Sequence, residues 1–333
     1  PAATQRRRLV WRHEQRYSMI FLLPLLSSLS LTHGGPTHHA IHWERPSRHT
    51  RILNGVRLTS IDYTYTIDGA EYEGYVSAPS TPDDHSVTAA PLSLPGVLVA
   101  HQWMGLGEME KFRADQMASF GYVAFALDMY GKGIRPTTSA EAKGNSSALT
   151  SDPAELHKRA LAALDVLREL STLVPGTPAV NGSALVAQGY CFGGLVALEL
   201  ARIGGGGDAP DTRLVASTVS KAPPKPPLVA VASFHGELGA LEPIAPGAIV
   251  TSVQVHHADL DSQGSQGLLA FEDEMRTAKV ANWATSKYGN CAHGWTDPTS
   301  SKYEEQAAVQ SHASMRHFFA YALGFNHCHP TSY

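Results

Sequence analysis

The 333-residue chain has 26 Lys and Arg against 30 Asp and Glu, a formal net charge of -4 at pH 7. That balance provides no field to attract nucleic acid or an anionic membrane surface, so partners of that kind are not expected. The length is enough to bury a sizeable core in one large α/β domain. The three cysteines Cys191, Cys291 and Cys328 are too few and too scattered for a disulfide framework or a zinc cluster, so no metal is expected.

Residues 1–50 are predicted to form a leader, either a targeting segment or a disordered one. Five arginines between positions 6 and 16 precede the apolar run "MIFLLPLLSSLSL" that starts at Met19. A basic flank before such a run resembles a secretory signal or an anchor, and the run is too short for a stable membrane span. An Arg- and Ser-rich leader also suits organelle import, so secretory, organellar and cytoplasmic locations all stay open.

From residue 51 to residue 173, strand patterns and helix patterns alternate. A hairpin is predicted over "SIDYTYTID" and "AEYEGYVSA", with its turn at Asp68-Gly69. The apolar run "PGVLVAHQ" predicts a strand buried on both faces. A helix over "EMEKFRADQMASFG" and another buried strand over "YVAFALDMYG" follow. A long helix is predicted from Ser151 to Leu173, because Ser151 or Asp152 can cap it, Pro153 suits its first turn and leucines recur at helical spacing.

The second half of the chain continues the alternation. The predicted order is strand, helix, strand, strand, helix, strand and helix, over "SALVAQGY", "GLVALELARI", "PLVAVASFHG", "GAIVTSVQVHH", "QGLLAFEDEMRTA", "NWATSKYG" and about Tyr303 to Leu323. The Gly-, Pro- and Ser-rich segment 204–227 is predicted to be a surface insertion, and residues 327–333 a short tail. Alternation of this kind predicts an α/β domain over 51–326, with a mostly parallel sheet covered by helices on both faces.

A tight turn with a cysteine at its centre joins the predicted strand "SALVAQGY" to the helix after it. Residues 189–193 spell G-x-C-x-G, the pattern of a nucleophile elbow with cysteine in place of serine. Gly189 and Gly193 leave room for the backbone to fold back on itself. The elbow lifts the sulfur of Cys191 above the sheet, where the positive end of the following helix favours thiolate over thiol. Cys191 is therefore predicted to be a nucleophile for acyl transfer.

Partners for this nucleophile are expected in loops that follow later strands. His293, in "YGNCAHGWTDP", is predicted to be the general base, since small residues surround it and its ring can reach the elbow. The segment "VQVHHADLDSQG" ends a strand and offers Asp259 and Asp261 as the acid that orients the base. Asp261 is preferred because "HADLD" lines up with the common hydrolase turn "HGDLD", and Asp259 stays a rival.

Two backbone N–H groups are needed to stabilise an oxyanion beside the nucleophile. One is expected from Phe192, the residue after the nucleophile, and the other from Gln102 or Trp103 in the loop after "GVLVAHQ". Aromatic and apolar residues near the elbow, including Trp103 and Trp295, are expected to line a substrate pocket.

The chain resembles the dienelactone hydrolase family of α/β-hydrolases over roughly residues 70 to 325. The resemblance rests on "GVLVAHQWMGLGEMEKFRADQMASFGYVAFALDMYGKG", "GYCFGG", "SFHGEL", "AFEDEM" and "YGNCAHGWTDP", which stand in the family's order. It implies a triad of Cys191, Asp261 and His293, with Phe192 and Trp103 as oxyanion donors. It also implies hydrolysis of an ester or lactone through a thioester, without a cofactor.

The sequence departs from the well-known members of that family at three positions. Gln102 stands where those members have a glutamate beside the nucleophile. The two arginines that bind the substrate carboxylate in those members fall on Lys132 and Asp297. Lys132 can still hold an anion as a point charge, whereas Asp297 would repel one. Gln102, Lys132 and Trp295 are accordingly expected to contact a small-molecule substrate that differs from the dienelactone.

A second hypothesis from another class is a non-catalytic or redox-sensing protein, in which a reactive Cys191 is oxidised instead of acylated. A binding module that uses only the pocket is a third. Acid and base candidates downstream of the elbow favour the hydrolase over both. The sequence does not indicate an oligomeric state.

Overall fold

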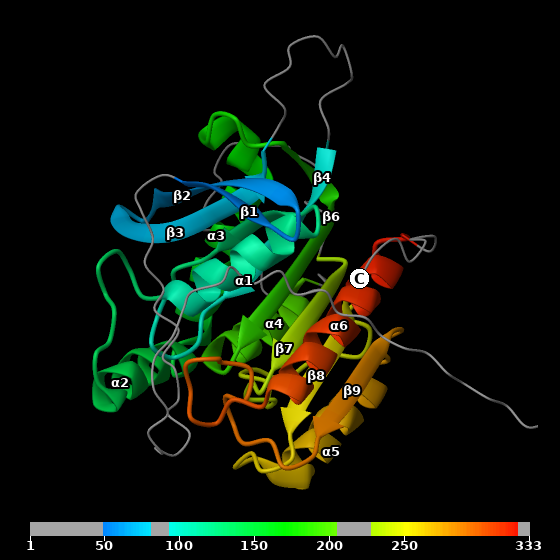
Figure 1. Ribbon diagram of the computed structural model, residues 1–333. Coiled ribbons are helices and arrows are strands. Elements are labelled where there is room, and N and C mark those ends of the chain that lie inside the picture. The colour runs from blue at the N-terminus through cyan, green and yellow to red at the C-terminus, as the bar shows by residue number, and fades with distance from the viewer. Residues whose placement is uncertain (1–48, 81–92, 205–227, 326–333) are drawn as a thin grey trace, which may run out of the picture. The chain divides into compact units, whose positions relative to one another are not determined.

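The computed structural model describes residues 49–80, 93–204 and 228–325. The predicted leader up to residue 48, the predicted insertion beyond Gly204 and the predicted tail lie outside these ranges. The strands, labelled in Figure 1, are β1 His49–Leu53, β2 Val56–Ile67, β3 Ala70–Pro79, β4 Ser93–Ala100, β5 Val123–Ala126, β6 Ala179–Tyr190, β7 Ala230–Phe234, β8 Ser252–Ala258 and β9 Trp283–Tyr288. The helices are α1 Glu108–Ser119, α2 Ser139–Thr150, α3 Pro153–Leu173, α4 Phe192–Ile203, α5 Gly264–Thr277 and α6 Glu305–Ala322.

The strands form one nine-stranded sheet in the order β1-β2-β3-β5-β4-β6-β7-β8-β9. The first three strands pair antiparallel, β3 pairs antiparallel with β5, and the six strands from β5 to β9 in this order are parallel. Strand β4 lies between β5 and β6, so successive connections leave it in opposite directions. Ligands of open α/β sheets bind at such a switch point, beyond the carboxyl ends of the strands.

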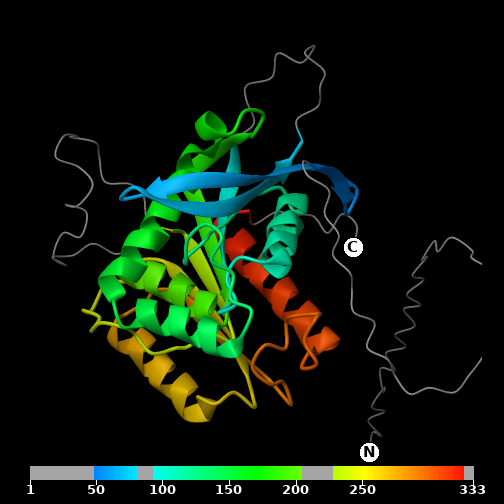
Figure 2. The ribbon, with the colours of Figure 1, turned by 90° about the vertical axis from the view of Figure 1, so that its left-hand side faces the viewer.

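Helices cover both faces of the sheet and form a separate core on each. Side chains of α3, α4 and α5, such as Leu164, Leu198 and Phe271, belong to the larger apolar cluster. Met117 of α1 and Met315 of α6 belong to the cluster on the opposite face. Figure 2 shows α1 and α6 on one side of the sheet and α3, α4 and α5 on the other. This is the mostly parallel sheet with helices on both faces that the alternation of strands and helices predicted, and it has the α/β-hydrolase architecture that the family resemblance implied.

Helix α3 forms where its sequence signals predict it. Asp152 caps it by accepting a hydrogen bond from the Glu155 amide at 3.1 Å, and Pro153 occupies the first turn. Its leucines at helical spacing are buried against the sheet and α4. In the described residues, no helix has both the length and the hydropathy needed to cross a membrane.

Three differences from the predicted elements have local causes. Helix α2 was missed because only Ala142 and Leu149 of its residues are buried, which leaves no apolar stripe to detect. The strand expected from Gly247 begins only at Ser252, since Gly247 has φ +80° in a turn. Strand β1 begins at His49, two residues before the expected start of the domain at residue 51, by pairing with β2.

Candidate active site

Cys191 lies at a sharp turn between β6 and α4 and has left-handed backbone angles, φ 54° and ψ -118°. A non-glycine residue adopts such angles only when its surroundings impose them. The neighbouring glycines show the cause. A Cβ atom on Gly189 would lie 1.8 Å from the Gly193 carbonyl oxygen, and one on Gly193 would lie 2.2 Å from the Ala100 oxygen. The turn therefore has the geometry of a nucleophile elbow.

The elbow lies at the switch point of the sheet. Strands β4 and β6 pair in parallel up to Ala100 and Gly189, so the loop that follows β4 passes beside Cys191. Cys191 occupies the N-cap position of α4, next to the positive end of that helix. Phe192 is the first residue of α4, and its amide has no acceptor within the helix.

His293 and Asp261 meet beside the elbow. The Nδ1 atom of His293 lies 2.8 Å from Oδ2 of Asp261, and the ring is close enough to Cys191 for that side chain to raise the pKa of the imidazole. Burial alone would lower the pKa of His293, but its interactions with Asp261 and Cys191 outweigh burial and raise it to about 10. Burial alone would raise the pKa of Asp261, but the hydrogen bond from His293 outweighs it and lowers the pKa to about 2. The site can therefore hold an imidazolium against the carboxylate of Asp261.

The rival carboxylate, Asp259, points to a different partner. Its Oδ1 atom lies 2.8 Å from Nζ of Lys287, in an exposed ion pair that lowers the pKa of Asp259. Asp261, by contrast, is buried, and its other carboxylate oxygen accepts hydrogen bonds from the Gln263 amide and the Ser262 hydroxyl. The contacts of the two candidate acids therefore differ, and only Asp261 is hydrogen bonded to His293.

The loop after β4 is held by three side chains that the sequence analysis did not single out. Glu110 accepts hydrogen bonds from the Gln102 amide at 3.3 Å and the Gly107 amide at 2.9 Å. Tyr130 donates its hydroxyl proton to the Trp103 carbonyl oxygen at 2.9 Å, and its ring stacks on Phe192. These contacts hold the loop that carries Gln102 and Trp103 against the elbow.

The third of these side chains is His101, which is fully buried at the end of β4. Its Nε2 atom accepts a hydrogen bond from the Met129 amide at 3.0 Å, so Nδ1 carries the proton and donates to the Gln102 carbonyl oxygen at 2.6 Å. Burial lowers the pKa of His101 to about 4, which keeps the ring neutral. Polar residues just after a buried strand were the sequence signal that could have identified it.

His235 was also missed, although it directly follows β7 in "SFHG". Its Nδ1 atom lies 3.2 Å from the backbone nitrogen of Cys191, and its Nε2 atom lies 2.8 Å from Oγ1 of Thr296. The centre of its ring is 5.0 Å from that of His293. His235 therefore touches both the elbow and the loop that carries His293.

The three residues expected to contact substrate occupy different surroundings. Trp295 is fully buried and packs on His235 and Tyr288, so the expectation that it lines a substrate pocket is wrong for this structure. Its indole fills the space beneath the site instead. Lys132 forms an ion pair with Glu71 at 3.1 Å, which neutralises its charge, while Gln102 stays half-buried beside the elbow.

Asp297, the position expected to repel an anion, accepts hydrogen bonds from the amide and hydroxyl of Thr299 at 2.8 and 2.7 Å. Its carboxylate therefore shapes the loop after His293. Among the described residues, no group of three His, Cys, Asp or Glu side chains is placed to hold a metal ion.

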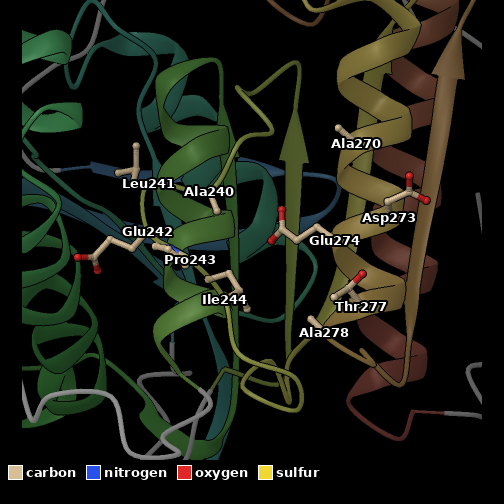
Figure 3. Close-up of a pocket in the computed structure, with 10 residues that line it drawn as sticks. All are labelled: Ala240, Leu241, Glu242, Pro243, Ile244, Ala270, Asp273, Glu274, Thr277 and Ala278. Carbon is tan, nitrogen blue, oxygen red and sulfur yellow. The ribbon is translucent and has the colours of Figure 1, made fainter.

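A hollow of about 500 Å³ lies away from the elbow, between residues 240–244 and α5 (Figure 3). It contains none of the predicted site residues. One of its acidic side chains, Glu274, already forms a salt bridge at 2.7 Å with the buried guanidinium of Arg202. The hollow is therefore not the candidate site.

Comparison with known proteins shows what the chain as a whole is similar to. A model of the dienelactone hydrolase family matches residues 85–209 and 215–323. A solved dienelactone hydrolase-like promiscuous phosphotriesterase, P91, from metagenomic libraries is 29% identical, with 80% of this chain and 98% of that chain covered at a TM-score of 0.61. A structure named m3DLH has the same identity and coverage at a TM-score of 0.62.

A more distant solved structure shares the fold alone. Esterase B of Lactobacillus rhamnosis is 13% identical, with 83% of this chain and 90% of that chain covered at a TM-score of 0.55. An uncharacterised protein of Caenorhabditis elegans is 33% identical over 155 residues, which are 46% of this chain and 80% of that protein.

Proposed function

Because the chain belongs to the dienelactone hydrolase family, we propose that it is a carboxylic ester hydrolase in which Cys191 is the nucleophile, His293 the general acid and base, and Asp261 the orienting acid. The observation that carries the proposal is the hydrogen bond between Asp261 and His293 beside the elbow that presents Cys191. Nucleophile, base and orienting group in that order are the signature of covalent acyl transfer.

In the acylation half, the thiol proton of Cys191 passes to His293, the sulfur attacks the ester carbonyl carbon, and the carbonyl π electrons move to oxygen. The amides of Phe192 and Trp103 stabilise this oxyanion, an effect typically worth about 3 to 4 kcal/mol for a donor. The tetrahedral intermediate collapses, the bond to the alcohol oxygen breaks, and His293 transfers its proton to that oxygen. The products of this half are an alcohol and a thioester on Cys191.

In the deacylation half, the thioester sulfur carries no charge. One of the groups that raise the pKa of His293 is thereby lost, so the neutral imidazole can remove a proton from water. The resulting hydroxide attacks the thioester carbonyl, the carbon–sulfur bond breaks, and the carboxylic acid leaves. Asp261 keeps the ring oriented through Nδ1 in both halves.

The pairing of the charged groups Lys132, Lys287 and Asp297 favours an uncharged substrate. The ammonium of Lys132 is paired with Glu71, and that of Lys287 with Asp259. Asp297 adds a negative charge to the loop that carries His293. A substrate carboxylate would find these cations already neutralised, so we propose neutral esters and lactones as the substrate class and expect anionic ones to be poor substrates.

Purified protein assayed on p-nitrophenyl acetate and small lactones, alongside Cys191→Ala, tests the proposal. Denaturing the wild type during turnover should trap one acetyl group on Cys191, detectable by mass spectrometry of the peptide. The variant should lose at least about 10³-fold in kcat/KM. Equal rates from both proteins, with no acyl group on Cys191, would contradict the proposal.

Two further arms of the assay address the alternatives. Paraoxon tests phosphotriester hydrolysis, since a relative that is 29% identical is named a promiscuous phosphotriesterase. Treatment with dilute peroxide followed by a sulfenic-acid probe tests the redox-sensing hypothesis for Cys191. Sulfenic acid formation without ester turnover would favour a redox sensor over a hydrolase.

A further inference from the structure

We propose that His235 and Thr296 form a positioning pair that holds the nucleophile and the base of this site at their working separation. The proposal rests on the function proposed above for Cys191 and His293. Neither side chain is needed for the bond-making steps, yet both are buried between the two residues that perform them, with 2% and 0% of their surface exposed.

The hydrogen bonds of His235 determine which of its nitrogens carries the proton. The backbone N–H of Cys191 can only donate, so the Nδ1 atom of His235, 3.2 Å away, accepts. Nε2 then carries the proton and donates it to Oγ1 of Thr296 at 2.8 Å. One neutral imidazole thus connects the elbow backbone to the loop after β9.

The charged groups around His235 keep it neutral. Burial, and then the charge of His293, lower its pKa well below the usual range, and Arg113 acts in the same direction. Asp261 is the group that opposes them. Protonation would also set an Nδ1–H against the Cys191 amide, two donors facing each other. The hydrogen bond from the Cys191 amide to His235 therefore persists while the site is active.

The backbone of His235, like that of Cys191, adopts a positive φ angle. His235 has φ +40°, and Cys191 has φ 54°, so two strained residues follow directly after the paired residues Tyr190 and Phe234. The Cys191 amide also donates to the Phe234 carbonyl oxygen at 3.0 Å. Movement of His235 would therefore move the backbone that carries the nucleophile.

His293 depends on the same pair from the other side. It lies in residues 289–304, which contain turns and no strand or helix. Thr296 attaches this segment twice, through its hydroxyl to His235 and through its carbonyl oxygen, which accepts a hydrogen bond from Arg113 at 2.7 Å. The ring of His235 packs 5.0 Å from that of His293, so it also limits how far the base can retreat from the sulfur.

Thr296→Val tests this directly, because valine has the shape of threonine without the hydroxyl, and Thr296→Ser is its matched control. We expect Thr296→Val to lower kcat/KM at least about 10-fold, since small misplacements of reacting groups are costly. His235→Asn, whose side chain can accept from the Cys191 amide but is too short to reach Thr296, should cause a similar loss. Thr296→Ser should stay within about 3-fold of the wild type.

A second readout is the rate of Cys191 alkylation by iodoacetamide as a function of pH. It reports the pairing of sulfur and imidazole and needs no ester substrate, so it separates failure of this inference from failure of the proposed hydrolase. The alkylation profile should move to higher pH in Thr296→Val and His235→Asn, and Thr296→Ser should restore it. Circular dichroism at the assay temperature identifies the variants that are folded. An unchanged alkylation profile in either folded variant, or an equal shift in Thr296→Ser, would overturn the proposal.

Discussion

Asp261 and Asp259 lie two residues apart, and the contacts of their carboxylates predict different consequences of mutation. Asp261→Asn should lower kcat/KM by about 10² to 10⁴-fold, because the amide cannot hold the imidazolium or fix its tautomer. Asp259→Asn is the matched control and should change the rate by less than about 3-fold, since that carboxylate pairs with Lys287. Steady-state kinetics on p-nitrophenyl acetate distinguish the two. A larger loss of kcat/KM in Asp259→Asn than in Asp261→Asn would show that Asp259 is the acid that orients His293.

The pH dependence of acylation follows from the raised pKa of His293. The imidazolium keeps its proton until the pH approaches about 10, so the leaving alcohol has an acid available over the neutral and mildly alkaline range. The pre-steady-state burst should therefore weaken only as the pH rises through about 10. Asp261→Asn removes the hydrogen bond that supports the imidazolium, so the decline should move to lower pH. A decline that stays in place would show that Asp261 does not set the protonation of His293.

At the scale of the elements, the elbow depends on close approach between β4, β6 and the first turn of α4. Gly193→Ala should destabilise the fold by on the order of 3 kcal/mol, because the new Cβ would lie 2.2 Å from the Ala100 oxygen. Gly144→Ala is the control, since a Cβ there meets nothing within 4 Å. Gly144 lies inside α2, where alanine should stabilise the helix by about 0.5 to 1 kcal/mol. Urea unfolding followed by circular dichroism measures both, and equal midpoints would contradict this account of the turn.

The elements also differ in how clearly the sequence marked them. Helix α3 was predicted because its cap, its early proline and its apolar stripe agree. Helix α2 escaped because it packs only two side chains, although Thr138 and Glu141 form a capping box at its start. That box marks the beginning of α2 in the sequence, although apolar periodicity does not.

For the molecule as a whole, acid should weaken the fold through histidines that are buried in neutral form. Burial lowers the pKa of His256 to about 3, and burial lowers the pKa values of His235 and His312 well below the usual range. These groups take up protons more readily in the unfolded chain, whose histidines have a pKa near 6.5. Their stabilisation is therefore complete above about pH 6.5 and is lost progressively as the pH falls, by up to about 1.4 kcal/mol per pH unit for each group.

Urea midpoints between pH 8 and pH 4 measure this loss. His256→Gln removes one of the titrating groups, so its stability should fall less steeply with acid than that of the wild type. His293 affects the stability of the fold over a different pH range. Because its pKa is raised, it contributes stability that is fully present below about pH 6.5 and is lost as the pH rises towards 10. Parallel pH profiles for the wild type and His256→Gln would exclude His256 as a source of the acid sensitivity.

The sequence by itself determined the features of this protein that depend on neighbours along the chain. The order of strands and helices, the cap of α3 and the G-x-C-x-G turn are local patterns, because periodicity, capping and backbone crowding act over a few residues. The family resemblance rested on the same short segments. The crowding of Gly189 against Gly193 follows from the turn itself, whereas the crowding of Gly193 against the end of β4 comes from the packing of β4 beside β6.

Only the tertiary structure decided which side chains meet across the loops. Asp259 and Asp261 have the same chemistry and nearly the same position, and the partner of each depends on how the turn after β8 directs it. The burial of Trp295 and the contacts of His235 depend likewise on three segments far apart in the chain packing together. Such packing is a non-local property, since it is fixed by the volume and hydrogen bonds shared among those segments.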